Sequence, residues 1–169
     1  MDPLSPETVV RLWDEYGDAL VLYAQQICET PEDAVQEAFL LLVRQGVAPD
    51  NPVGWIYRVV RNRALNAART CGRQARREAV AATRRVPWFE STVGEGLDAD
   101  EAAAALTQLP VEEREAIVAR LWGGLSFEEI AGLHGTSLST VYRCYQRGLA
   151  ALRERLGESC PTKKKTTKI

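Results

Sequence analysis

Helical periodicity in every apolar segment is the feature that most restricts the fold of this chain. Apolar residues recur at intervals of three and four, and no run shows the alternation and β-branched enrichment of a strand. A chain of 169 residues can form two small helical domains, each near the lower size limit that a single core stabilises. We therefore expect an all-α protein with two small helical domains.

Start signals place the first two helices. Ser5-Pro6 begins the first, and Thr30-Pro31 begins the second, where Asp33 completes a capping-box pattern. Their predicted buried stripes are Val9, Trp13, Tyr16, Leu20, Tyr23 and Ile27 in the first helix, and Val35, Ala38, Phe39 and Leu42 in the second.

A third and longer helix is predicted from Asn51-Pro52 to about Arg77. At 100° per residue its two faces separate, because the apolar and the basic residues fall on opposite arcs. A charged face is commonly only solvated, but Glu78 is the sole acid between Asn51 and Arg85, which favours contact with a polyanion. The apolar arc is Ile56, Val60, Ala64, Ala67 and Cys71, and the opposite arc is Trp55, Arg58, Asn62, Asn66, Arg69, Arg73 and Arg76.

Charge alternates strongly along the chain, although the net charge is only −2. Basic and acidic residues number two and ten in 1–50, nine and one in 51–85, two and eight in 86–120, and eight and four in 121–169. Local positive fields, and not the total, decide where a polyanion binds. The low net charge therefore does not exclude a nucleic-acid partner.

Periodicity fades after Arg85, and five acids without a basic residue occupy 86–101, which indicates a flexible acidic linker. The lysine-rich tail after Pro161 has the composition of a disordered segment. The predicted organisation is a first domain over 1–80, a linker over 81–100, a second domain over 101–158 and a disordered basic tail over 159–169.

The second domain contains a helix-turn-helix pattern over 126–147. Ser126 and Glu129 form a capping box, Gly135 permits a left-handed turn, and Ala131 and Val141 suit close packing of two helices. An ordinary helical hairpin is the alternative. The stripes predicted to be buried are Ala102, Ala105, Leu106, Leu109, Ile117, Val118, Leu121 and Trp122 before the motif, and Leu138, Val141, Tyr145, Leu149, Leu152 and Leu156 in the last helix.

If Val141 and Tyr145 point inward, a polar face remains at the front of the last helix. Such groups can hydrogen-bond base edges or phosphates in a major groove, although its arginines could also serve only as solubilising charge. The face consists of Ser139, Thr140, Tyr142, Arg143, Gln146 and Arg147.

No pattern of a catalytic or metal site is present in the sequence. The cysteines at 28, 71, 144 and 160 form no Cys-x-x-Cys pair, and His134 is the single histidine, so we expect reduced structural thiols, no cofactor and no enzyme activity. His134 is expected to be a partly buried structural residue. Neither a secretory signal nor a membrane span is predicted, which favours the cytoplasm and argues against membrane insertion.

Three segments resemble the small extracytoplasmic-function (ECF) type of bacterial sigma factor. Residues 31–44 are similar to that family's polymerase-clamp helix, residues 51–69 to its promoter-melting and minus-ten segment, and residues 109–156 to its minus-thirty-five domain. The three segments occur in the family's order and spacing. Tyr142 and Cys144 depart from its pattern, since the family often has basic residues there.

The resemblance implies a sigma factor that binds core RNA polymerase and promoter DNA, with an anti-sigma factor as a further partner. A stand-alone helix-turn-helix regulator is the alternative, but it leaves the first domain unexplained. The resemblance implies polymerase contacts by Asp33, Gln36 and Glu37, and the acidic linker would lie in the channel for nascent RNA. Expected promoter contacts of the first domain are Trp55, Arg58, Arg61, Asn62, Asn66, Arg69 and Arg73, with packing of Trp55 against the core as its alternative role.

Overall fold

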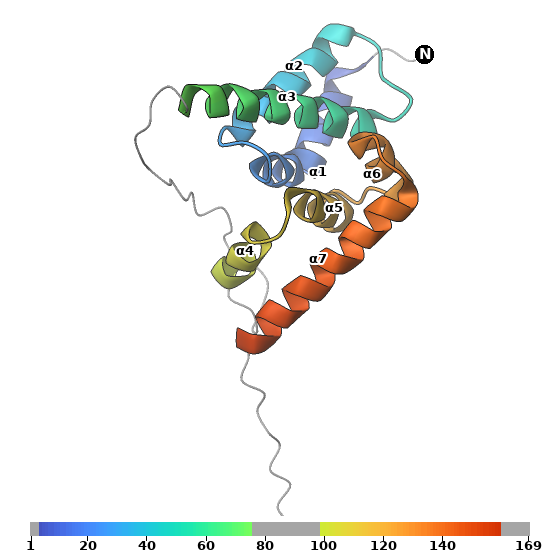
Figure 1. The fold of residues 1–169 in the computed structure, drawn as a ribbon. Coiled ribbons are helices and arrows are strands. Elements are labelled where there is room, and N and C mark those ends of the chain that lie inside the picture. The colour runs from blue at the N-terminus through green and yellow to red at the C-terminus, as the bar shows by residue number, and fades with distance from the viewer. Residues whose placement is uncertain (1–3, 76–98, 160–169) are drawn as a thin grey trace, which may run out of the picture.

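The computed structural model describes residues 4–75 and 99–159, and α-helices occupy most of both ranges (Figure 1). No β-strand occurs in these ranges, which confirms the all-α prediction. No helix within them is long and apolar enough to cross a membrane. Nearly all of the predicted linker and the predicted tail lie outside the described residues. The helices are α1 (Pro6–Gln25), α2 (Pro31–Gln45), α3 (Pro52–Ala75), α4 (Ala99–Thr107), α5 (Val111–Leu121), α6 (Phe127–His134) and α7 (Leu138–Ser159).

The first two helices begin at the predicted residues but are capped differently. Ser5 Oγ accepts a hydrogen bond from the backbone N–H of Thr8 at 3.2 Å. The side chain of Thr30 makes no such bond, so the predicted capping box with Asp33 is wrong. The ψ angle of Thr30 is 64°, whereas that of Ser5 is 149°. The backbone of Thr30 is therefore not in the extended conformation that directs the hydroxyl of a cap residue at the first turn. α2 ends at Gly46, which is left-handed with φ 70°.

The buried face of α1 is wider than the predicted stripe. Leu20 and Tyr23 are buried as predicted, whereas Leu12 is buried and Trp13 is half exposed, with its ring edge against Phe39 at 4.9 Å between centroids. The cause is a third neighbour, because α5 from the second half of the chain packs on α1 in addition to α2 and α3. One stripe derived from local spacing cannot anticipate a third covering helix.

α3 follows its prediction over its first half. Ile56, Val60 and Ala64 are fully buried and Ala67 is half buried, but Cys71 is exposed, contrary to prediction. In Figure 1 the ribbon of α3 extends beyond α1 and α2 at its carboxyl-terminal end, and Cys71 Sγ lies 3.6 Å from Glu29 Oε2 in the turn that joins those two helices.

The second half of the chain builds its core around α5. Leu106, Leu109, Ile117 and Val118 are buried as predicted. The exposed residues lie at helix ends, where the chain leaves its neighbours. Three residues predicted as buried are therefore half exposed: Leu121, Trp122 and Leu138.

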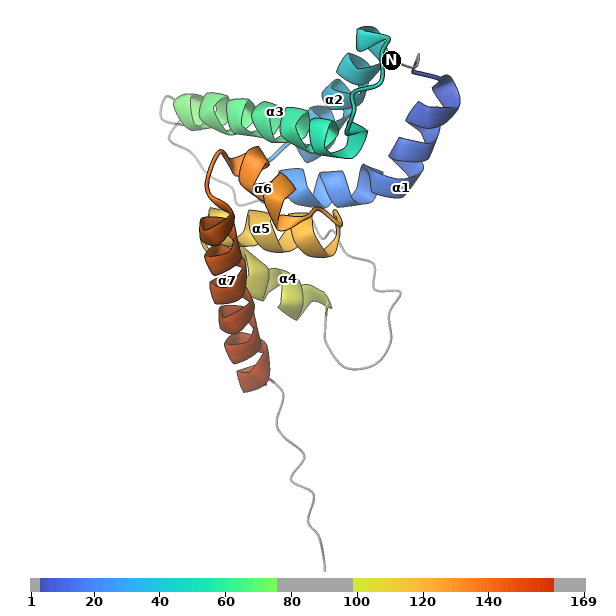
Figure 2. The ribbon, with the colours of Figure 1, turned by 90° about the vertical axis from the view of Figure 1, so that its right-hand side faces the viewer.

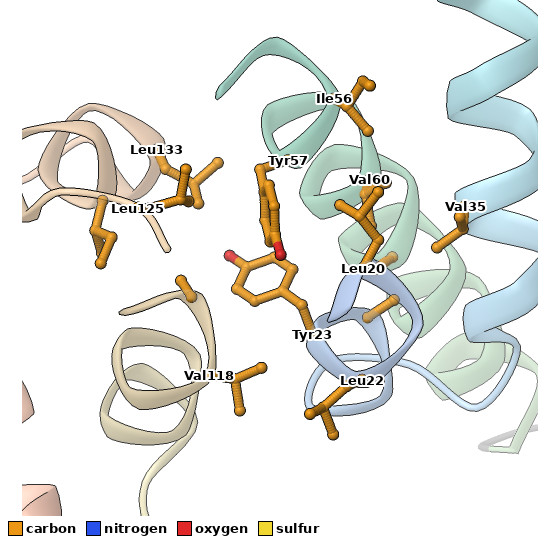
Figure 3. Close-up of a cluster of buried hydrophobic side chains, with 14 of the residues drawn as sticks. Leu20, Leu22, Tyr23, Val35, Ile56, Tyr57, Val60, Val118, Leu125 and Leu133 are labelled. Carbon is orange, nitrogen blue, oxygen red and sulfur yellow. The ribbon is translucent and has the colours of Figure 1, made fainter. Parts of the chain in front are cut away.

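The two halves share one continuous hydrophobic core. α5 packs on α1, and α6 packs on α3 (Figure 2). The halves therefore form a single closed body over the described residues. Figure 3 shows the contact, at which Leu22, Tyr23 and Tyr57 of the first half face Val118, Leu125 and Leu133 of the second.

Candidate nucleic-acid interface

α6, the turn at Gly135 and α7 form the predicted helix-turn-helix. Both bonds of the capping box are present, because Ser126 Oγ accepts from the Glu129 N–H at 3.1 Å and Glu129 Oε2 accepts from the Ser126 N–H at 2.7 Å. The bond from the Ser126 amide lowers the pKa of the Glu129 carboxyl. Gly135 has φ 65°, and Ala131 and Val141 are buried. These local features hold α7 at a fixed angle to α6.

The front of α7 presents its predicted polar face to solvent. Tyr142 is partly engaged, since its ring lies edge-on to Phe127 at 5.4 Å, and Arg147 Nε lies 3.3 Å from Glu113 Oε1. Arg143 forms no ion pair with any described residue. Arg143 and Gln146 are therefore the two long side chains most available to base edges. Of the six predicted residues, Ser139, Tyr142, Arg143, Gln146 and Arg147 are exposed and Thr140 is half buried.

We use the name α3 arc for the first-domain residues expected to contact DNA, namely Trp55, Arg58, Arg61, Asn62, Asn66, Arg69 and Arg73. Their side chains differ in burial and in the groups that they contact. Trp55 is half buried and packs against the core, as its alternative role required. Arg61 Nε lies 3.2 Å from Glu115 Oε2, so this arginine faces the second half of the chain and not open solvent. The side chain of Arg73 lies outside the described residues. The exposed members are Arg58, Asn62, Asn66 and Arg69.

The predicted polymerase-binding residues lie exposed on α2. Asp33 and Gln36 are free of any hydrogen bond or ion pair with a described residue. Glu37 Oε2 lies 3.2 Å from Arg63 Nε of α3, and both side chains are about half exposed. Asp33 therefore offers the less engaged of the two carboxylates.

A polar cluster between the two halves was missed by sequence reasoning. Glu115 of α5 is 1% exposed, and its Oε2 lies 3.2 Å from Arg61 Nε of α3 and 3.0 Å from His134 Nε2 of α6. The His134 contact has ion-pair distance but is misaligned for a hydrogen bond. Because a buried carboxylate needs a compensating cation, Arg61 is tied to this position by charge. One signal was available, since helical spacing places Glu115 on the same face as the buried Val118.

The same boundary contains most of the buried polar atoms that lack a protein hydrogen-bond partner. Burial raises the pKa of Tyr23 well above its usual value, with Glu115 adding to the effect, and burial also raises the pKa of Tyr57. Glu115 and Arg114 keep partners through their other atoms, since Glu115 Oε2 lies 3.2 Å from Arg61 Nε and Arg114 donates to the carbonyl oxygen of Gln26 at 3.1 Å. Of the six such atoms among the described residues, five belong to Tyr23, Tyr57, Arg114, Glu115 and His134.

Comparison with known proteins identifies relatives of both halves. Residues 99–152 match the family model described as sigma-70, region 4. The chain is 31% identical over 176 aligned residues to the ECF RNA polymerase sigma factor SigE of Mycolicibacterium smegmatis. That alignment covers 93% of this chain and 66% of the relative, so the chain spans slightly less than two thirds of its relative's length.

Two solved structures share the fold. The sigma factor RpoE of Bartonella quintana, solved with the anti-sigma factor NepR, matches with a TM-score of 0.76 and 23% identity, covering 90% of this chain and 98% of that one. CnrH, solved with the cytosolic domain of CnrY, matches with a TM-score of 0.61 and 22% identity, covering 92% of each chain. At these identities the likeness establishes the arrangement of helices.

Proposed function

This chain belongs to the ECF sigma factors, and on that premise we propose that it binds core RNA polymerase and directs promoter recognition, DNA melting and transcription initiation. The observation that carries the proposal is the presence of two separate faces suited to DNA, the α3 arc and the front of α7, on one chain. A factor that contacts two promoter elements needs both faces. A stand-alone helix-turn-helix regulator needs only the second, so that alternative is not favoured.

The front of α7 would contact the minus-thirty-five element in the major groove. Arg143 and Gln146 have the side-chain length and the free donors for base edges, whereas Ser139 and Thr140 at the helix start suit phosphates. Arg147 would first have to leave Glu113. This role belongs to the proposed second domain, residues 101–158.

The α3 arc would bind the minus-ten element and the strand released by melting. Exposed Asn62 and Asn66 stand beside Arg58 and Arg69, so amides can contact bases while guanidinium groups hold the backbone. Trp55 packs on the core, so its proposed role is to support the α3 arc and not to stack on a base. This role belongs to the proposed first domain, residues 1–80, with 81–100 as the linker between the domains.

The exposed acidic side of α2 would bind the polymerase clamp through Asp33, Gln36 and Glu37. The protein would act by binding and without catalysis of its own, in the bacterial cytoplasm where core polymerase works. Its structural relatives were solved with an anti-sigma factor and with the cytosolic domain of CnrY, which supports an anti-sigma factor as a further partner.

Run-off transcription tests the proposal. Purified core polymerase with and without the full chain is incubated with fragments of the source genome, and the transcripts are sequenced. The proposal requires discrete transcripts that depend on the chain. Tight binding to a duplex by the chain alone, with no effect on transcription by core polymerase, would instead establish the stand-alone regulator.

A further inference from the structure

Two large apolar side chains are exposed on the helix that is proposed to enter the major groove. Leu138 is the first residue of α7 and is 46% exposed, and Tyr142 follows one helical turn later and is 49% exposed. Side chains four residues apart lie beside each other on a helix surface, so we call this pair the apolar stripe. The amino-terminal end of a recognition helix is the part that contacts base edges. The apolar stripe therefore lies at the position where base pairs are recognised.

The ring of Tyr142 is held from one side. It makes a T-shaped contact with Phe127 of α6, with 5.4 Å between ring centroids and 82° between the ring planes. Phe127 is itself held, because the guanidinium carbon of Arg120 lies 5.0 Å from its centroid and the ring of Tyr145 lies 5.2 Å away. Figure 1 shows α6 beside the amino-terminal end of α7. A side chain that is ordered before binding loses little rotamer freedom when it contacts DNA.

We propose that Leu138 and Tyr142 recognise thymine in the minus-thirty-five element through its C5-methyl group, and that Phe127 positions the ring of Tyr142 for this contact. This proposal rests on the proposed function of α7. In the major groove the base edges offer hydrogen-bond donors, acceptors and a single kind of apolar group, which is the methyl group of thymine. Carbon atoms gain free energy by covering that methyl group and gain none from the polar edges of the other bases. The neighbouring Ser139 and Arg143 supply the polar contacts that a stripe of carbon atoms lacks.

Deoxyuridine isolates this contact, because it keeps the base pair of thymidine and lacks only the C5-methyl group. The chain-dependent transcripts from genome fragments identify promoters. Each thymine of a minus-thirty-five element, on either strand, is replaced in turn, and the affinity of core polymerase carrying the full chain is measured for each duplex by competition. Burial of one methyl group corresponds to about a fourfold change in affinity. We expect the wild-type holoenzyme to lose about fourfold at one thymine for each residue of the apolar stripe, and to be insensitive at other thymines.

Each variant should remove one methyl dependence and leave the other. Tyr142→Ala should bind thymine and uracil equally at one position, Leu138→Ala should do so at the second, and Tyr142→Phe should keep both dependences because it keeps the ring. Phe127→Leu should reduce the dependence that belongs to Tyr142 and preserve that of Leu138, a selective loss that a general decrease in stability does not produce. Leu121→Ala is the matched control, since it removes a similarly exposed leucine from the end of α5 and should keep both dependences.

The outcomes separate this proposal from the proposed function. A minus-thirty-five element without thymine, or a wild-type holoenzyme that binds every thymine and uracil duplex equally, overturns the recognition of thymine, as does methyl dependence that survives both alanine variants. A Tyr142→Phe variant that behaves like Tyr142→Ala assigns the contact to the phenolic oxygen and overturns the role of the ring. The wild-type comparison of the two bases needs no variant, so it decides even where circular dichroism shows a variant to be unfolded. If no fragment gives a chain-dependent transcript, the proposed function fails and this proposal with it.

Discussion

A Cβ atom on Gly123 would lie 2.6 Å from the phenolic oxygen of Tyr57, so the turn after α5 approaches α3 this closely only because residue 123 lacks a side chain. The same atom would lie 2.6 Å from the carbonyl oxygen of Ala119. We expect Gly123→Ala to lower the free energy of unfolding by about 1–3 kcal/mol in urea titrations, as overpacking does. Adding Tyr57→Phe removes the nearer of the Tyr57 contacts and should restore part of this loss.

Gly132→Ala is the matched control for that prediction, because the nearest heavy atom to its Cβ is 3.9 Å away. Alanine there should be tolerated or slightly stabilising, since it favours the helix. Equal stability of the Gly123→Ala and wild-type proteins would show that the two halves do not meet in solution as the structure describes.

The capping box of α6 should make stability depend on pH through Glu129. Its pKa is lowered in the folded protein from the ordinary value of 4.5, so its contribution is fully present above pH 4.5 and is lost as the pH falls through the lower folded value. The stability difference between wild type and Glu129→Gln should therefore be constant near neutral pH and shrink in acid. Ser126→Ala should cost about 1 kcal/mol at pH 7. A difference that stays constant into acid contradicts this role of the carboxylate.

Charge reversal on α2 should weaken association with core polymerase without harming the fold. Asp33→Lys is preferred over a change at Glu37, because Glu37 pairs with Arg63 and its reversal would also disturb α3. We expect about tenfold weaker binding in a pull-down titration, roughly 1.4 kcal/mol. Asp50→Lys makes the same charge change on the exposed loop before α3 and should bind normally. Normal binding by Asp33→Lys would remove α2 from the polymerase surface.

The free arginine of α7 should contribute more to sequence preference than the paired one. Arg143→Ala is expected to cost about 1–3 kcal/mol of promoter binding by the holoenzyme and to change preference at the minus-thirty-five element. Arg147→Ala should cost less, since binding by Arg147 first breaks its contact with Glu113. Binding to a panel of mutated promoters separates the two. A uniform loss with a shallower salt dependence would make Arg143 a phosphate contact.

Substitutions at Asn62 and Trp55 should distinguish a role in promoter melting from a role in packing of the core. Asn62 is exposed, so Asn62→Ala should leave thermal stability unchanged, fail to transcribe duplex promoters and recover on a template with a pre-opened bubble. Trp55 packs against the core, so Trp55→Ala should lower the melting temperature. An Asn62→Ala variant that stays inactive on the bubble has lost something other than strand capture.

Local sequence patterns predicted the structure correctly where a feature depends on a single helix, cap or turn. The capping box of Ser126 and Glu129, the left-handed Gly135 and the outward face of Arg143 and Gln146 all follow from spacings of a few residues, because the hydrogen bonds and faces involved close within one or two helical turns. The same reasoning failed at Thr30, whose ψ angle of 64° is not the extended conformation of a capping residue and whose side chain makes no cap hydrogen bond.

What the sequence determined by itself was therefore the helical class, the helix-turn-helix and the two polar faces, since each depends on the order of side chains along a single helix. Only the tertiary structure decided which of those side chains remain free. Arg61 and Glu115 are 54 positions apart, and arginine and glutamate are residue types that are usually exposed to solvent. Their pairing exists because the packing of α5 on α1 and of α6 on α3 buries the carboxylate, and a buried charge is stable only where folding also brings its counter-charge.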